Sequence, residues 1–274
     1  MTEKILLFIP AYNCEKQITR VLDQVDESIM NYISEVIVVN NLSTDSTEEK
    51  VIQYIKEYPR LPIKLLRNYE NYGLGGSHKT AFNYAIKNDF DYIIVLHGDD
   101  QGDIHDLLPI LQTENYKNYD CCLGARFMRG SKLKGYSKFR TFGNLVYNML
   151  FSIVVKQKIC DLGSGLNLYR VKILKDRFWY KYPDKLTFNY CMIMAANQFK
   201  HKTTFFPILW REDDQVSNVK MTSQAINVLV MLCKYFLARE KFLKSDLREN
   251  IIDEYGADII YESGNQHGEK EMVL

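Results

Sequence analysis

Short apolar runs alternate with amphipathic stretches along the first 113 residues. Continuous apolar runs with the length of buried strands lie at 5–9, 36–39, 62–66 and 92–96. Apolar residues at helical spacing predict helices over 15–32, around 51–55, over 77–88 and over 104–113. Strands that alternate with helices favour parallel pairing with right-handed crossovers. The pattern therefore predicts an α/β fold with a mostly parallel central sheet flanked by helices.

Each of these strands is followed by a polar segment. The four segments span residues 10–13, 40–47, 68–76 and 97–101. Because the carboxyl ends of parallel strands meet at one edge of a sheet, we expect the segments to converge there and form a binding site.

The segment 97–101, His-Gly-Asp-Asp-Gln, carries the most distinctive chemistry. His97, Asp99 and Gln101 point to one face if the backbone stays extended. Ligands of this kind suit Mg²⁺ or Mn²⁺ that carries a phosphorylated substrate. A solvated turn after a strand explains the same residues and stays open as the alternative.

A glycine cluster precedes the helix expected at 77–88. Gly73, Gly75 and Gly76 resemble a phosphate-cradling loop, although neither the P-loop nor the dinucleotide fingerprint is present. Lys79 follows in the first helical turn, where it adds a positive charge toward a phosphate. A tight turn with close helix packing and a solvated lysine are the alternatives.

The second half changes in character after a strand expected at 120–124. Residues 126–158 contain eight Lys and Arg and no Asp or Glu, and they surround an apolar segment at 145–155. This pattern suits an anionic membrane surface or an anionic acceptor, and a core helix suits the apolar segment equally well. A late strand is expected over 203–210, one long apolar or amphipathic helix over 221–244, and a polar, partly disordered tail over 245–274. Residues 1–220 are expected to form the main domain.

Composition excludes several classes of protein. The 274 residues are 46% hydrophobic and 25% charged, with a net charge of +1, which is typical of a globular protein without a field that attracts nucleic acid. The six cysteines form no CxxC pair, and we expect them to be reduced, buried and cytosolic. No signal peptide and no membrane-spanning stretch are expected.

The order of the motifs resembles the inverting family 2 glycosyltransferases, and among them the polyprenol-phosphate branch that includes dolichol-phosphate mannosyl- and glucosyltransferases. The resemblance covers roughly residues 4–220. It rests on PAYN at 10–13, VVNNLSTDST at 38–47, HGDDQ at 97–101, Gly124-Ala125-Arg126, DLGSGL at 161–166, and Ser217-Asn218 with Lys220. Asn40 and Asn41 replace two aspartates of the family pattern, His97 replaces the first aspartate of the metal motif, and Glu15 stands one position late.

The resemblance implies a GT-A type nucleotide-diphospho-sugar transferase fold and assigns roles to particular residues. The residues expected to bind the nucleotide are Pro10, Ala11, Tyr12, Asn13, Glu15, Asn40, Asn41, Asn71, Gly73, Gly76, Lys79, Gly98 and Asp99. The residues expected to hold Mn²⁺ or Mg²⁺ are His97, Asp99 and Gln101. The residues expected at the acceptor phosphate are Arg126, Arg140, Ser164, Arg211 and Lys220. The residues expected in catalysis are Asp99, Asp161 and Arg126.

The implied activity is metal-dependent, inverting transfer of a sugar from a GDP- or UDP-sugar to a polyprenyl phosphate, at the inner face of the membrane. A membrane partner protein stays open. Three alternatives remain at this point: transfer to a sugar hydroxyl in cell-surface polysaccharide synthesis, a nucleotide-sugar binding protein without catalysis, and a peripheral membrane scaffold. A hydroxyl acceptor requires a general base, for which Asp161 and Asp213 are the carboxylates to test.

Overall fold

The computed structural model describes residues 3–212, 221–264 and 272–273. Its strands are β1 (Ile5–Ala11), β2 (Glu35–Asn40), β3 (Ile63–Asn68), β4 (Tyr92–Leu96), β5 (Cys121–Ala125), β6 (Lys132–Lys134), β7 (Leu166–Arg170), β8 (Thr203–Pro207), β9 (Leu209–Arg211), β10 (Ala257–Glu262) and β11 (Met272–Val273). Its α-helices are α1 (Ile18–Asp23), α2 (Glu27–Met30), α3 (Thr47–Glu57), α4 (Gly73–Lys87), α5 (Leu108–Gln112), α6 (Lys138–Val155), α7 (Val171–Leu174), α8 (Thr187–Gln198), α9 (Met221–Leu237) and α10 (Arg239–Lys244). Its 3₁₀ helices are η1 (Ile104–Leu107), η2 (Asn115–Asn118) and η3 (Phe178–Lys181).

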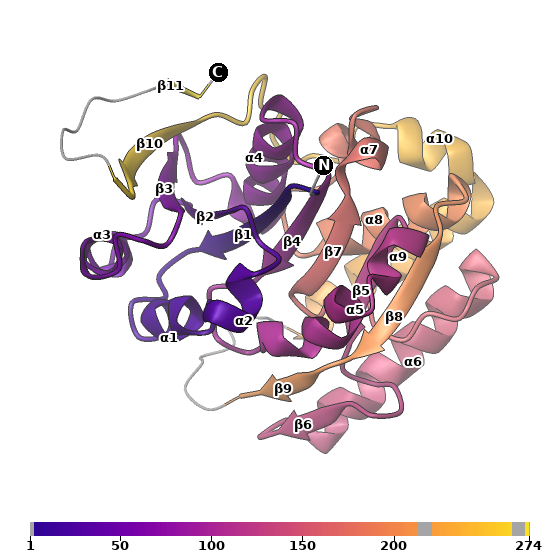
Figure 1. Cartoon of the computed structure of the whole chain (residues 1–274). Coiled ribbons are helices and arrows are strands. Elements are labelled where there is room, and N and C mark those ends of the chain that lie inside the picture. Colours follow the sequence, from indigo (N-terminus) through magenta and orange to yellow (C-terminus); the bar gives the residue numbers. More distant parts are fainter. Residues whose placement is uncertain (1–2, 213–220, 265–271, 274) are drawn as a thin grey trace.

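A central sheet crosses the molecule, and within the described residues its strand order is β11-β10-β3-β2-β1-β4-β7-β5-β8 (Figure 1). The strands β3, β2, β1 and β4 are parallel to one another, while β7 runs antiparallel between β4 and β5 and β10 runs antiparallel to β3. The short strands β6 and β9 pair in parallel as a separate two-stranded sheet. The expectation of a mostly parallel sheet flanked by helices is confirmed.

Side chains alternate between the two faces of the sheet, so each face has its own apolar core. Leu6 and Phe8 of β1 pack with α4, α6, α8 and α9, whereas Leu7 and Ile9 pack with α1 and α3 on the other face. Both faces of the parallel strands are therefore covered, which explains why these strands appear in the sequence as continuous apolar runs.

Several expected elements have different bounds, for local reasons. The helix expected over 15–32 divides into α1 and α2, because the Asp26 carboxylate caps a new helix by accepting from the amides of Ser28 and Ile29. Helix α4 begins at Gly73 rather than Ser77. The strand expected over 203–210 divides after Pro207, and β9 joins β6. The single helix expected over 221–244 divides at Ala238, whose backbone is not helical.

Two further expectations are corrected: the polar tail after residue 244 and the burial of all six cysteines. Residues 257–262 were expected in a polar tail, but they form β10, which pairs antiparallel with β3 in the central sheet. This segment therefore belongs to the main fold. All six cysteines are free thiols, but Cys233 is exposed and Cys160 is only half-buried.

Candidate active site at the carboxyl edge of the sheet

Backbone hydrogen bonds join the polar segments that follow β1, β2 and β4. The Asn41 amide donates to the Ala11 carbonyl over 2.9 Å, and the Gly98 amide donates to the Pro10 carbonyl over 3.1 Å. A Cβ at position 98 would lie 2.8 Å from the Pro10 oxygen, so only glycine permits this approach. The convergence expected from the sequence is confirmed.

The first segment is fastened to the second by side chains. Asn13 adopts a left-handed backbone conformation (φ 49°), and its Oδ1 accepts from the Thr44 amide over 2.8 Å. The Glu15 carboxylate accepts from the Ser46 amide over 3.1 Å. Tyr12 is different, because half of its side chain is exposed. Asn13 and Glu15 thus shape the loop, and Tyr12 presents a ring at its surface.

The two asparagines that replace aspartates are buried and engaged within the protein. Asn40 donates from Nδ2 to the Glu48 carboxylate over 2.7 Å, and Arg67 binds the same carboxylate. An aspartate at position 40 would instead repel Glu48. Asn41 donates to Asn71 Oδ1 over 2.7 Å and accepts from Asn68 over 2.9 Å. These side chains build the base of the site, and their expected contact with the nucleotide stays a prediction.

The glycine cluster allows the start of α4 to pack closely against neighbouring residues. A Cβ on Gly75 would lie 2.9 Å from Asp184 backbone atoms, and the Gly75 amide donates to the Asp184 carbonyl over 2.8 Å. The Gly73 amide donates to Asn71 Oδ1, and a Cβ on Gly76 would overlap the Tyr72 side chain. The alternative of a tight turn with close helix packing therefore describes this segment.

Lys79 does not lie where the sequence predicts, in a position to face a phosphate. Its side chain is fully buried, and Nζ donates to the Tyr182 carbonyl over 2.6 Å and to Asp184 over 2.7 Å, with Tyr255 Oη 3.1 Å away. Burial lowers the pKa of the Lys79 ammonium to about 8, although Asp184 opposes the shift. A lysine with no exposed surface cannot reach a nucleotide phosphate.

The metal motif follows β4 directly. Asp99 is half-buried, and burial raises the pKa of its carboxyl to about 6, partly opposed by the Gln101 amide, which donates to Oδ1 over 3.2 Å. His97 is packed against Gly165, where a Cβ would lie 2.8 Å from the imidazole ring. The ring centroids of His97 and His78 lie 6.0 Å apart in a T-shaped arrangement. Burial lowers the pKa of His97 to about 4, so the ring is neutral at physiological pH.

The described part of the chain contains no cluster of three His, Cys, Asp or Glu side chains that could hold a metal ion. The donor set at this edge, a carboxylate at Asp99 and an amide at Gln101, nevertheless fits a hard divalent cation that takes its other ligands from substrate phosphates and water. Among the described residues His97 Nε2 is buried without a hydrogen-bond partner, and its place among the metal ligands stays a prediction.

Arg126 and Asp161 form one buried unit. The guanidinium donates to the carboxylate from both Nε and Nη2 over 2.8 Å, and the Arg126 amide adds a third bond of 2.8 Å. Burial opposes the charge on Arg126, but Asp161 outweighs it and raises the guanidinium pKa. The rings of Phe127 and Trp210 cover the guanidinium. Asp161 is therefore held as the counter-ion of Arg126, and its expected role in catalysis stays a prediction.

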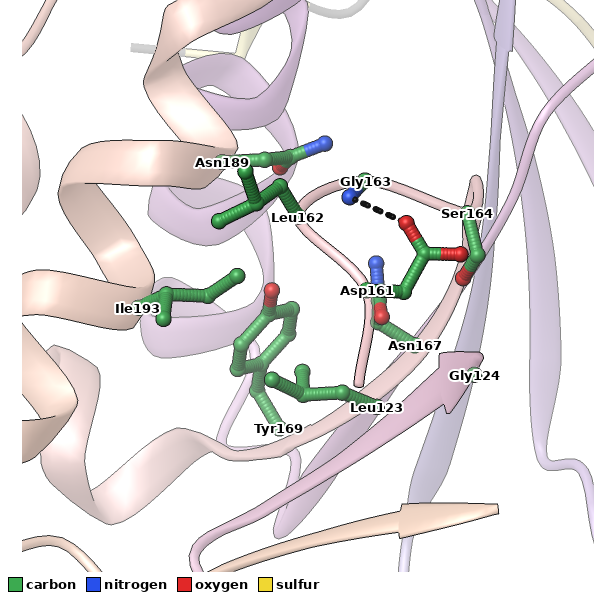
Figure 2. A pocket seen from close by; sticks show the side chains of 10 residues that line it. All are labelled: Leu123, Gly124, Asp161, Leu162, Gly163, Ser164, Asn167, Tyr169, Asn189 and Ile193. Atoms are coloured by element: carbon green, nitrogen blue, oxygen red, sulfur yellow. Dashed lines mark hydrogen bonds between the residues drawn. The ribbon is translucent and has the colours of Figure 1, made fainter. Parts of the chain in front are cut away.

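The loop that carries Asp161 is packed rather than open (Figure 2). Asp161 Oδ1 accepts from the Gly163 amide over 3.1 Å, and Tyr169 and Asn189 lie beside a cavity of about 10 Å³, which has room for roughly one water molecule. Ser164 is buried, and its hydroxyl donates to the Leu166 carbonyl. Ser164 thus closes the loop and does not reach an acceptor phosphate.

The other cations expected at the acceptor are paired with carboxylates. Arg140 Nη1 lies 2.8 Å from Glu212 Oε1, and Arg211 Nη2 lies 2.7 Å from Asp100 Oδ1. Lys220, together with Asp213 and Ser217-Asn218, lies outside the described residues. Arg126, Arg140 and Arg211 each have a carboxylate partner in the fold, and their expected place at an acceptor phosphate stays a prediction.

Several residues that shape the site were missed in the sequence. Asn68 connects the base of the site to α4, because it donates to Ser77 Oγ and accepts from Thr80 Oγ1. Asp184 and Tyr255 hold Lys79 from distant parts of the chain. The strand β7 was also missed. A buried lysine has no sequence signature of its own, whereas Asn68 at the end of an apolar run was a usable signal.

Known proteins can be compared with this geometry. A family model described as glycosyl transferase family 2 matches residues 7–178. A dolichyl-phosphate beta-glucosyltransferase of Trichomonas vaginalis is 24% identical over 241 residues, which are 82% of this chain and 72% of that protein. A dolichyl-phosphate beta-glucosyltransferase of Drosophila melanogaster is 22% identical, and the match covers 77% of this chain and 68% of that protein.

Solved structures share the fold. Glucosyl-3-phosphoglycerate synthase of Mycobacterium tuberculosis in complex with UDP superposes with a TM-score of 0.60 at 14% identity, over 85% of this chain and 80% of that chain. Residues 1–349 of S. aureus TarS superpose with a TM-score of 0.56 at 18% identity, over 85% of this chain but only 65% of that one. Because the family model matches more than half of the chain, and the sheet edge carries the expected motifs, this protein belongs to glycosyl transferase family 2 and is a glycosyltransferase with a GT-A fold.

Proposed function

We propose that this glycosyltransferase moves a hexosyl group from a UDP- or GDP-sugar to a polyprenyl phosphate, with inversion and with Mn²⁺ or Mg²⁺ at Asp99 and Gln101. The observation that carries the proposal is the convergence of the segments after β1, β2 and β4 around Asp99. The names of the two dolichyl-phosphate relatives support the acceptor class.

In the proposed reaction, one acceptor phosphate oxygen attacks the anomeric carbon as the bond to the diphosphate breaks. The nucleoside diphosphate leaves from the opposite face, so the configuration inverts. A bound divalent cation would neutralise the charge that grows on the departing diphosphate. Tyr12 and the loop fastened by Asn13 would border the nucleotide.

The state of Asp161 favours a phosphate acceptor over a sugar hydroxyl. A hydroxyl must lose its proton to a base during transfer, whereas a phosphate oxygen is already anionic. Asp161 is nearly inaccessible and is engaged by Arg126 through two side-chain bonds. Positioning and charge neutralisation are sufficient for the phosphate.

A test of this function compares donors and acceptors directly. The protein is incubated with Mn²⁺, a panel of UDP- and GDP-sugars, and either a polyprenyl phosphate or soluble oligosaccharides, and the anomeric configuration of the product is read by NMR. Asp99→Ala should lower turnover by on the order of a hundredfold or more. Asp103→Ala, four residues further on at the cap of η1, is the matched control. Turnover only with sugar hydroxyls, or a retained configuration, would refute the proposal.

We also propose that the flank formed by α6 and α9 contacts the membrane in which such an acceptor resides. Large apolar side chains stand exposed along α6, with Phe139 at 75% and Ile153 at 66%, and along α9, with Leu237 at 81%. Lys132 and Lys134 of β6 and Lys138 are also exposed. Only Asn148, Phe151 and Val155 of α6 are buried, so most of the helix is not core. Across the described ranges, no helix is long and apolar enough to cross a bilayer.

The membrane contact predicts salt-sensitive binding to anionic liposomes. Each lysine near an anionic surface contributes about 1 kcal/mol, so replacing Lys132, Lys134 and Lys138 by Gln should weaken binding by up to roughly a hundredfold at low salt. Exposed lysines at the opposite end of the sheet, Lys172, Lys175 and Lys200, provide a matched triple control. Equal binding by the two triple variants, or binding that ignores salt, would count against this surface.

A further inference from the structure

Asp100 is a buried carboxylate that the proposed chemistry does not use. It stands between Asp99 and Gln101, its side chain is only 7% exposed, and its backbone is left-handed (φ 57°). Such a conformation is unfavourable for a non-glycine residue and persists where the surroundings enforce it. The neighbours of Asp100 therefore determine the shape of the proposed metal loop.

Helix α1 holds Asp100 from one side. Arg20 Nε donates to Oδ2 over 2.7 Å, and Gln24 Nε2 donates to Oδ1 over 3.0 Å. Gln24 also accepts, through Oε1, from the Ile104 amide over 3.0 Å, which fastens the far end of the loop. The amide of one glutamine thus links Asp100 to the start of η1.

Strand β9 holds the loop from the other side through Arg211. Its Nη2 donates to Asp100 Oδ1 over 2.7 Å, and its Nε donates to the Asp100 carbonyl over 2.9 Å. The Arg211 amide donates to the Gln101 carbonyl over 3.0 Å. Three bonds from one residue, with the planar fork that only arginine supplies, fix the loop against β9.

β9 connects onward to the flank that we propose as the membrane contact. It pairs with β6, where Arg211 is opposite Lys134, and the Glu212 amide donates to the Lys134 carbonyl over 3.0 Å. The Glu212 carboxylate binds Arg140 of α6. A path of hydrogen bonds and an ion pair therefore leads from the metal loop through β9 to α6. The strands β9 and β6 lie next to α6 in Figure 1.

We propose that Asp100 is a positioning residue: by bridging Arg20 and Arg211 it fixes the loop carrying Asp99 and Gln101 against β9, so that the donor's metal is set at a defined place relative to the acceptor side of the site. The inference rests on the proposed function. It assigns Asp100 no contact with substrate and no proton transfer.

The test uses Asp100→Asn and, in case that variant does not fold, Arg211→Lys, which keeps the charge and the backbone bond but loses the fork. Asp120→Asn is the matched control, because Asp120 pairs with Arg170 at the start of β5, the opposite end of the sheet. Two readouts are measured: Mn²⁺ titration in the presence of UDP or GDP, and hydrogen exchange of the segments 98–104 and 209–212 in the metal-free protein.

We expect the Mn²⁺ concentration for half-maximal binding to rise tenfold or more and kcat to fall, while metal-free nucleotide affinity stays unchanged. Exchange should rise in both segments together, and Asp120→Asn should change none of these quantities. If the wild type binds neither UDP nor GDP with metal, the proposed function fails and the positioning role with it. If the wild type binds and both variants stay within twofold of it, only the positioning role is overturned.

Discussion

Replacing Asp161 by Asn tests whether this carboxylate is a counter-ion or a base. Asp161 and Arg126 have side chains that are 1% and 10% exposed, and three bonds of 2.8 Å join them. Removing one member of a buried pair leaves the other charge uncompensated, which costs about 3–5 kcal/mol. The amide oxygen of Asn still accepts from backbone amides, so the loss should come mainly from the charge on Arg126.

The assay is urea or thermal unfolding of four proteins: wild type, Asp161→Asn, Arg126→Met and the double variant. At about 2–4 °C per kcal/mol for a chain of this size, each single variant should lose on the order of 10 °C in Tm. The double variant should regain most of that loss, because no buried charge remains, with a coupling energy of at least about 2 kcal/mol. Additive losses, or an Asp161→Asn variant as stable as wild type but inactive only toward sugar-hydroxyl acceptors, would refute the counter-ion interpretation and restore the base.

Two further predictions concern the packing behind the site. The pKa of Lys79 is lowered from 10.5 to about 8, so the unfolded chain binds more protons than the folded protein between these pH values. The free energy of unfolding of the wild type, relative to that of Lys79→Met, should therefore rise by about 2–3 kcal/mol from pH 8 to pH 10.5, as measured by denaturant unfolding. A difference that stays constant with pH would show that Lys79 does not titrate in this range. Gly75→Ala should destabilise the protein by about 1–3 kcal/mol, because the new Cβ would meet the Asp184 backbone. In Gly143→Ala of α6 the new Cβ meets nothing within 4 Å, so this variant should stabilise the protein by about 0.5–1 kcal/mol. Equal melting temperatures for the two variants would contradict this packing.

The apolar pattern was sufficient for β1, β2 and β4 because these parallel strands are buried on both faces. Ile5 to Ile9 and Tyr92 to Leu96 could therefore be located without any knowledge of their neighbours. β7 was missed because its residues, Leu166 to Arg170, follow a glycine-bearing loop and do not form a continuous apolar run. The apolar pattern identifies strands whose residues are nearly all apolar. It overlooks strands such as β7, which are held in the sheet by hydrogen bonds to neighbouring strands.

The polar segments do converge at one edge of the sheet, as the sequence predicts. The sequence shows which residues gather at the edge, and it does not show which of them already have partners. Asn40 is bound to Glu48 eight positions away, whereas Lys79 is bound to Asp184 and Tyr255, 105 and 176 positions away. Long-range pairing of charges depends on the completed packing, so Arg126, Arg140 and Arg211 appeared available in the sequence when each has a carboxylate in the fold.

The pairing of β10 with β3 has a consequence for the order of events during synthesis. β10 extends the sheet beyond β3, and just before it Tyr255 reaches Lys79 while the Tyr69 amide donates to the Gly256 carbonyl. A nascent chain that has reached residue 244 contains every motif of the candidate site. It still lacks Tyr255 and Gly256, which contact Lys79 and Tyr69 on either side of the glycine turn. This edge of the sheet is therefore completed late in translation, and ribosome-bound chains stalled before residue 255 should remain open to proteolysis around residues 69–76.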